Sequence, residues 1–173
     1  FCLNLYHLLV AHSQLVFGTS DNFIALAKVM GRACYEVGGD VLSLAELEHG
    51  VLRAAMAPPD QLGAALLIPR GAPYSLRLPF AEPRISLALS VGSSSTPCAV
   101  PVYRSPTANA QLSAACQRAL SPSNNDGESP SSCVGVIVKP KKGVVFLPKV
   151  MQWYREDFNV SITGTSSSST ALA

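Results

Sequence analysis

Two glycine-centred turns, each between short apolar segments, constrain the fold of this chain most. Gly38 and Gly39 stand together in the first turn, and Gly143 ends the second turn after a run of lysines. Glycine adopts the positive φ angles that tight turns between antiparallel strands require. The sequence therefore predicts two β-hairpins, which pair residues 35–37 with 41–42 and residues 134–138 with 144–147.

Helical patterns occupy most of the chain around these turns. Ser43 and Glu46 have the spacing of a capping box, in which each side chain bonds the backbone N–H of the other residue. Thr107 stands at a comparable start position, and Pro148 suits the first turn of a helix because the N–H that it lacks would have no partner there. The predicted helices cover residues 1–17, 21–30, 44–55, 107–120 and a segment that begins at Pro148.

Residues 84–91 alternate strictly between apolar and small side chains. Ile85, Leu87, Leu89 and Val91 would lie on one face of a strand, with serines and an alanine on the other face. A period of two residues is typical of a half-buried β-strand. The segment therefore predicts a further strand, followed by a Gly-Ser turn where the backbone can approach a ligand closely.

Together these elements predict a single α+β domain, in which a small antiparallel sheet packs against several helices. One hydrophobic core of ordinary size is expected for 173 residues of which 48% are hydrophobic. The domain is expected over residues 1–160, with a flexible polar insert at residues 121–132 and a disordered serine-rich tail at residues 161–173. Because the chain begins with Phe1 inside a helical pattern, we expect it to be a piece of a longer protein.

Four blocks of sequence also carry a family resemblance. They read F-C-L-N-L-Y-H at residues 1–7, L-S-L-A-E-L-E-H-G-V-L-R at residues 42–53, E-P-R-I-S-L-A-L at residues 82–89 and W-Y-R-E-D-F at residues 153–158. In this order they resemble the domain-of-unknown-function 547 family. Bacterial-type members of that family look like papain-like cysteine hydrolases or transferases, so the resemblance implies a papain-like fold for this chain.

The chain departs from the bacterial-type pattern at the residues that would carry chemistry. The family's histidine in the third block falls on Ser86, the acidic residue of that block becomes Glu82, and the family's cysteine falls on Thr96. The plant-type, eukaryotic branch resembles this chain more closely, since its members also lack that histidine and cysteine. The resemblance therefore implies a degenerate form of a cysteine-hydrolase cleft, a pseudoenzyme without the reacting groups.

The blocks predict one binding cleft, formed by Asn4, Glu48, Ser86 and Thr96. The Asn4 amide either donates to an oxyanion or a carbonyl of a ligand, or satisfies a neighbouring backbone group. Glu48 either orients a polar group in the cleft or pairs with an arginine, Arg53 or Arg84, that ties its helix to the predicted strand. The favoured function is a non-catalytic binding or scaffold module of a larger intracellular protein, with a protein or peptide partner in this cleft.

The alternative is a cysteine-type hydrolase or transferase that uses Cys98, His49 and Glu48. A cysteine nucleophile needs a base within hydrogen-bond reach, and His49 is the available histidine. His7 and His12 are five residues apart, whereas a metal-binding pair on a helix needs a spacing of three or four, so no metal site is predicted. The sequence contains no phosphate-binding, dinucleotide-binding or calcium-binding motif, and no cofactor is expected.

Charge and cysteine content narrow the cellular context. A net charge of +2 is too small to indicate nucleic-acid binding, and the lysines around Gly143 predict a solvated turn in preference to a polyanion site. The apolar runs are shorter than the ~20 residues that a membrane span requires, so no span is expected. Five cysteines without C-x-x-C spacing predict a reduced, cytoplasmic environment.

Overall fold

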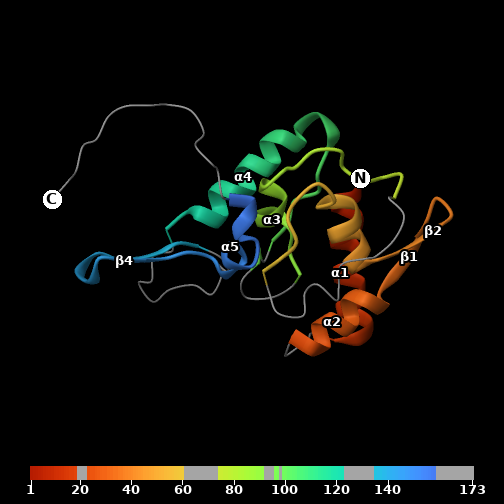
Figure 1. Cartoon of the computed structure of the whole chain (residues 1–173), viewed down its shortest axis with the longest axis horizontal. Helices are drawn as coiled ribbons and strands as arrows, with labels where there is room; N and C mark the ends of the chain where they lie inside the picture. Colours follow the sequence, from red (N-terminus) through yellow and green to blue (C-terminus); the bar gives the residue numbers. More distant parts are fainter. Residues whose placement is uncertain (19–22, 61–73, 92–95, 98, 123–134, 159–173) are drawn as a thin grey trace.

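The computed structural model describes residues 1–18, 23–60, 74–91, 96–97, 99–122 and 135–158. Within these ranges the chain combines helices with two separate antiparallel hairpins, which confirms the predicted α+β class (Figure 1). The first two residues of the helix predicted at residues 21–30, most of the insert at residues 121–132 and the tail after residue 160 lie outside the described residues. None of the helices described is long and apolar enough to cross a membrane.

The elements follow one another as helix, hairpin, helix and hairpin, with short helical segments between them. In chain order they are α1 (Cys2–Phe17), α2 (Phe23–Arg32), β1 (Cys34–Val37), β2 (Asp40–Ser43), η1 (Glu46–Leu52), α3 (Arg84–Ala88), η3 (Ser105–Thr107), α4 (Ala108–Leu120), β3 (Ile137–Lys139), η4 (Pro140–Lys142), β4 (Val144–Phe146), α5 (Lys149–Trp153) and η5 (Arg155–Phe158).

The hairpin of β1 and β2 forms at the predicted glycine turn. Val37 pairs with Asp40, so only Gly38 and Gly39 lie between the strands. Their φ angles are +65° and +93°, a region that residues with a Cβ atom rarely adopt. The turn reverses the chain so that β2 places Leu42 in the core, where this side chain is 1% exposed.

The capping box predicted at Ser43 is present. The Ser43 N–H and hydroxyl donate to Oε2 of Glu46 over 2.8 and 2.6 Å, and the Glu46 N–H donates to the Ser43 hydroxyl over 3.3 Å. The helix that follows, η1, is a π-helix, in which an N–H bonds the carbonyl five residues earlier. The 2.8 Å bond from the Arg53 N–H to the Glu48 carbonyl is one of these bonds. Such turns are rare and often occur at functional sites.

The strand predicted at residues 84–91 is wrong, because the structure forms the helix α3 over Arg84–Ala88. Ile85, Ser86, Leu87 and Ala88 are all buried. Alternation indicates a strand only where one face meets solvent, and this segment is enclosed on all sides. The small serine and alanine side chains let neighbouring elements approach α3 closely. The alternation of large and small residues in this segment therefore reflects the space available around the helix.

The position of α3 at the centre of the domain joins two hydrophobic clusters. Ile85 belongs to the main cluster, together with Tyr6 of α1 and Leu47 of η1. Leu87, two residues later, belongs to a second cluster with Val150 of α5. A short helix therefore connects the N-terminal and C-terminal parts of the fold, and its side chains lie where both parts meet.

The hairpin of β3 and β4 extends from the end of the domain opposite to the first hairpin (Figure 1). The strands pair in the predicted antiparallel arrangement, with Val138 opposite Val145. Gly143 ends the turn with a φ of +61°. All three residues of β4 are exposed, so β4 contributes no residue to the core. The first hairpin differs, because β2 buries Leu42 there.

Candidate functional site

Glu48 lies at the centre of the candidate site, on η1, where it is 3% exposed. Each of its carboxylate oxygens accepts a hydrogen bond from a tyrosine. Tyr6, on α1, donates its hydroxyl to Oε2 over 2.7 Å. Tyr154, the residue that follows α5, donates its hydroxyl to Oε1. Because a buried carboxylate without partners is costly, these two donors explain how the fold tolerates Glu48 in its interior.

Both tyrosines are held in their neutral form. Burial raises the pKa of the Tyr6 and Tyr154 hydroxyls well above the ordinary value of 10.0, and the charge of Glu48 raises it further. A neutral hydroxyl keeps the proton that it donates. Both hydroxyls therefore act as donors to Glu48.

A second set of contacts surrounds Arg53. Its guanidinium lies over the Tyr154 ring, 3.6 Å from the ring centroid, and forms a buried ion pair with Asp157 of η5. It also donates to the Ser86 hydroxyl and, over 2.9 Å, to the Ala57 carbonyl. Ser86 in turn donates to Asp157 over 2.7 Å. These partners offset the cost of removing the charge from water.

Tyr154 joins the two sets of contacts, since it donates to Glu48 and stacks against Arg53. We call the joined residues the buried polar network: Tyr6, Glu48, Arg53, Ser86, Tyr154 and Asp157. The network links α1, η1, α3 and η5, so it brings both ends of the described chain together. Hydrogen bonds among groups in a low-dielectric interior favour this arrangement of the elements. Arg53 Nε is a buried atom of the network that has no hydrogen-bond partner.

The ion pair considered for Glu48 with an arginine is not present among the described residues. Arg53 pairs with Asp157, and Arg84 pairs with Glu82, at 2.6 Å, on a partly exposed part of the surface. Glu48 therefore ties its helix to α1 and to the segment after α5 through tyrosine hydroxyls.

Asn4, on the same helix as Tyr6, uses its amide on the backbone of Tyr103. Its Nδ2 donates to the Tyr103 carbonyl and its Oδ1 accepts from the Tyr103 N–H, both over 2.8 Å. The structure thus matches the second alternative for Asn4, a satisfied backbone partner. Next to it, the His7 ring stacks on the Tyr103 ring, and His7 Nε2 accepts from the Ser90 N–H over 3.2 Å. Burial lowers the pKa of His7 to about 4, so the ring is neutral near pH 7.

Two of the four residues predicted to form the cleft meet in the network. Glu48 and Ser86 are linked through Arg53 and Tyr154, and Ser86 is 1% exposed. Asn4 lies on α1 with its amide already engaged, and Thr96 is buried at 3% exposure. The predicted cleft residues are therefore mostly enclosed, and their part in binding a partner stays a prediction.

The alternative enzyme would use Cys98, His49 and Glu48, of which His49 and Glu48 are neighbours on η1. Cys98 lies outside the described residues. His49 follows Glu48 on η1 and is half-buried; burial lowers the pKa of its imidazole, and the charge of Glu48 partly opposes this effect. A neutral imidazole does not stabilise a thiolate by charge. In the part of the chain that the structure describes, no group of three His, Cys, Asp or Glu residues is placed to hold a metal ion.

Comparison with known proteins identifies the family. A sequence model described as "Protein of unknown function, DUF547" matches residues 1–119, the larger part of the chain. This chain belongs to the DUF547 family. No curated protein and no solved structure matches it. The match runs from α1 into α4, whereas Tyr154 and Asp157 of the network lie beyond its end.

Sequence reasoning missed the roles of Tyr6, Tyr154 and Asp157 in this DUF547 domain. All three stand inside the blocks that carry the resemblance, Tyr6 in the first block and the other two in the last. The signal that could have found them is the polar residue within each block. Buried polar residues need partners, so blocks far apart in sequence that each contain one are expected to meet.

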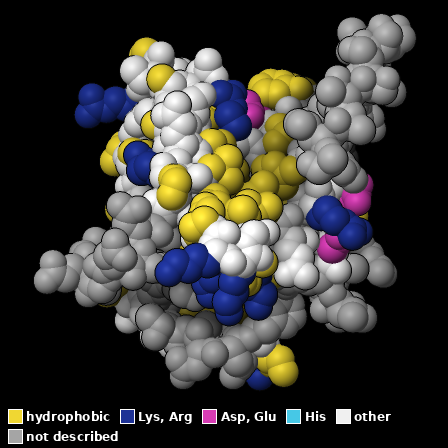
Figure 2. Space-filling view, turned by 90° about the vertical axis from the view of Figure 1, so that its left-hand side faces the viewer, with side chains coloured by type: hydrophobic (Ala, Val, Ile, Leu, Met, Phe, Trp, Pro, Cys, Tyr) yellow, Lys and Arg dark blue, Asp and Glu magenta, His cyan; other side chains and the backbone are white. Residues whose placement is uncertain are grey.

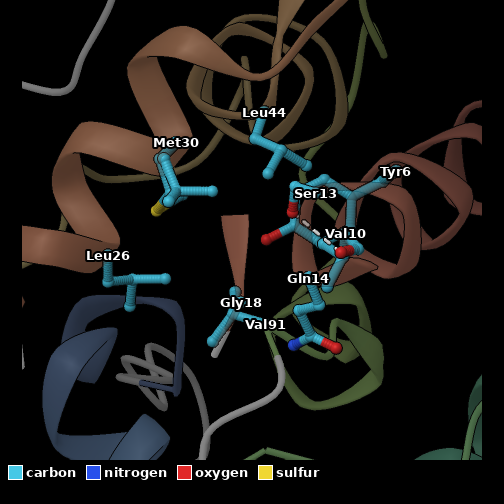
Figure 3. Close-up of a pocket in the computed structure, with 10 residues that line it drawn as sticks. Tyr6, Val10, Ser13, Gln14, Gly18, Leu26, Met30, Leu44 and Val91 are labelled. Carbon is cyan, nitrogen blue, oxygen red and sulfur yellow. Dashed lines mark hydrogen bonds between the residues drawn. The ribbon is translucent and has the colours of Figure 1, made fainter. Parts of the chain in front are cut away.

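Tyr6 also lines a pocket of the DUF547 domain, between α1 and α2, whose walls are partly apolar and partly polar. Figure 3 shows Leu26 and Met30 of α2 across this pocket from Val10 and Gln14 of α1. The cavity volume is about 40 Å³, enough for a few water molecules. Ser13 donates its hydroxyl to the Val10 carbonyl over 2.8 Å. Among the described lining residues, the Gln14 amide is the polar group that remains available to a ligand.

Proposed function

We propose that this DUF547 domain is a non-catalytic binding or scaffold module of a larger cytoplasmic protein, with a protein or peptide as its partner. The buried polar network carries the proposal. Both oxygens of Glu48 accept from tyrosines, and the Ser86 hydroxyl bonds both Arg53 and Asp157. A general acid or base must reach a substrate atom directly or through one water, and these groups are engaged inside the domain.

In this proposal the degenerate cleft serves as a frame for a neighbouring binding surface. Tyr6 belongs to both parts: its hydroxyl is held by Glu48, and it is one of the residues that line the pocket between α1 and α2. A wall that is fixed before the partner arrives lowers the entropy cost of binding. The predicted residues Glu48 and Ser86 thus support the site through Tyr6 and through the packing of α3.

The size and lining of the pocket favour a peptide side chain as its occupant. Pockets for small molecules usually measure about 300–1,000 Å³, whereas this cavity has about 40 Å³. That volume suits the methyl end of a leucine or methionine side chain. The apolar walls from Leu26, Val29 and Met30 would bury it, and the Gln14 amide is placed to bond the peptide backbone.

A substitution that fills the pocket tests this proposal. Leu26→Trp places a larger side chain at the pocket, and Ile24→Trp, on the same helix but 67% exposed, is the matched control. Peptides selected from a displayed library against the wild-type domain are titrated against all three proteins. We expect an apolar anchor residue in the selected peptides, a roughly 10-fold or larger rise in Kd for Leu26→Trp, and little change for Ile24→Trp. Equal affinities for the three proteins would contradict the pocket.

Alkylation of Cys98 distinguishes the binding module from a cysteine hydrolase or transferase. Cys34 is an exposed thiol of the same chain and provides an internal reference. A catalytic thiolate reacts rapidly below the free-thiol pKa of about 8.5. At pH 6 we expect iodoacetamide to label Cys98 no faster than Cys34, and His49→Ala to leave that rate unchanged. If Cys98 is labelled rapidly and His49→Ala abolishes this labelling, the proposal of a binding module is wrong and the cysteine hydrolase or transferase is supported.

A further inference from the structure

The hairpin of β3 and β4 exposes apolar side chains on both of its faces. Strand pairing places Val138 and Val145 on one face and Phe146 on the other. We call residues 137–149 the lysine arm. Its exposed apolar side chains are each between 40% and 56% exposed: Val138, Val144, Val145, Phe146 and Leu147. Apolar side chains that gather in one exposed segment typically mark a surface that another molecule covers.

The lysine arm is also strongly basic. It contains four lysines and no Asp or Glu, whereas the whole chain has a net charge of only +2. The four lysines are exposed: Lys139, Lys141, Lys142 and Lys149. Among the described carboxylates, none forms an ion pair with them. The local charge therefore favours an anionic partner, although the net charge of the chain does not.

The shape of the arm decides which kind of anionic partner fits. The arm is a narrow, convex ribbon that projects from the domain (Figure 1). A protein partner would need a cleft that covers both faces of this ribbon. The interfacial layer of a bilayer surrounds a convex segment without a preformed cleft, and the water in that layer still solvates the open edges of the two strands.

We infer that the lysine arm binds the surface of an anionic lipid bilayer, with its valines and Phe146 in the interfacial layer and its lysines among the lipid phosphates. Lysine stems are long enough to reach the phosphates while the apolar groups enter the layer to a depth of about 5–10 Å. The Lys139 Nζ lies 5.0 Å from the centroid of the Phe146 ring, so a charge and an apolar anchor already stand side by side.

The position of the arm leaves the proposed peptide pocket accessible. Figure 2 views the end of the molecule from which the arm projects and shows Lys and Arg side chains gathered next to hydrophobic ones. The helices α1 and α2, which form the pocket, lie toward the other end in Figure 1. The domain could therefore lie on a membrane and hold a partner at the same time, and each proposal can fail without the other.

Sedimentation with lipid vesicles tests the inference on the full chain. The wild-type protein is mixed with vesicles of phosphatidylcholine alone or of phosphatidylcholine with phosphatidylserine. We expect retention only by the vesicles that contain phosphatidylserine, weaker at higher salt. Each lysine near an anionic surface contributes a factor of roughly five, so replacing Lys139, Lys141 and Lys142 together by glutamine should lower the partition coefficient on the order of 100-fold. Phe146→Ser should lower it roughly 10-fold.

Exposed residues elsewhere in the domain supply the controls. Lys28→Gln removes an exposed lysine of α2, and Val102→Ser removes a valine that is 70% exposed. Both variants should bind vesicles like the wild type. The inference is wrong if phosphatidylserine vesicles fail to retain the wild-type chain or retain the triple lysine variant equally well. If Phe146→Ser binds vesicles as tightly as the wild type, the arm does not insert apolar groups into the bilayer. The inference would then be replaced by binding through charge alone, and an acidic protein would be an equally suitable partner.

Discussion

The buried polar network and the lysine arm depart from the usual distribution of side chains in opposite directions. The network places the charges of Glu48, Arg53 and Asp157 in the interior, whereas the arm places valines and Phe146 at the surface. In the network, every charged group has partners within the chain. In the arm, the lysines have no carboxylate partner among the described residues.

This difference indicates what accounts for the unusual side-chain distribution in each region. Burying polar groups is compatible with folding when they satisfy one another, so the fold itself accounts for the network. Exposed apolar groups contribute little to the stability of the folded chain, and the partner surface that we propose would account for the arm. Substitutions in the network should therefore change the stability of the domain, and substitutions in the arm should change binding while stability stays the same.

The largest effect is expected from Arg53→Met. It leaves Asp157 as a buried charge without its partner, and breaking a buried pair in this way typically costs about 3–5 kcal/mol of the free energy of unfolding. Urea denaturation measures the loss. Arg155→Met, which breaks the exposed pair with Asp60, should cost less than about 1 kcal/mol.

A double variant tests whether the charge left behind is the cause of that loss. Arg53→Met combined with Asp157→Leu removes both charges, so it should be more stable than Arg53→Met alone. If Arg53→Met and Arg155→Met lower stability equally, the network does not differ from a surface ion pair, and the comparison with the arm fails.

The next effect is expected from Glu48→Gln, which keeps the shape of the side chain. Glutamine has one acceptor oxygen, so either Tyr6 or Tyr154 loses its hydrogen-bond acceptor inside the domain. A buried donor without a partner costs about 1–3 kcal/mol. Thermal or urea unfolding should show this loss, and Glu36→Gln on the exposed face of β1 should show almost none. Adding Tyr154→Phe to Glu48→Gln should recover part of the stability.

The pH dependence of stability should show a smaller contribution from buried His7. Its pKa is about 4 in the folded state and about 6.5 in the unfolded chain, so between these values the unfolded state binds more protons. The contribution is complete above pH ~6.5 and is lost as the pH falls toward 4. Between pH 7 and 5 the loss is on the order of 1–2 kcal/mol. His7→Gln should flatten this part of the urea-midpoint curve, and an unchanged slope would contradict the contribution of His7.

The smallest effect on stability is expected in the arm. Val145→Ala should change the free energy of unfolding by less than about 0.5 kcal/mol, because this side chain is 55% exposed. Val150→Ala removes the same atoms from a valine that is 4% exposed in the second cluster, and should cost about 1–3 kcal/mol. A large loss for Val145→Ala would show that the arm is part of the folding core.

The candidate site was predictable from the sequence only in part. The blocks identified Glu48 and Ser86 as residues that matter, and both lie in the network. Their partners came from the two ends of the described chain, Tyr6 near its beginning and Asp157 near its end. Sequence spacing describes neighbours within a few residues, so it did not indicate which distant side chains would satisfy these groups.

By itself the sequence determined the local elements of this domain. The glycine turns, the capping box at Ser43 and the helix of α4 were predicted because each depends on residues that are neighbours in the chain. Only the tertiary structure decided that residues 84–88 form a helix, that Glu48 bonds two tyrosines and that the valines of the arm stay outside. These outcomes depend on burial, and burial is set by segments that are far apart in sequence and meet only in the folded domain.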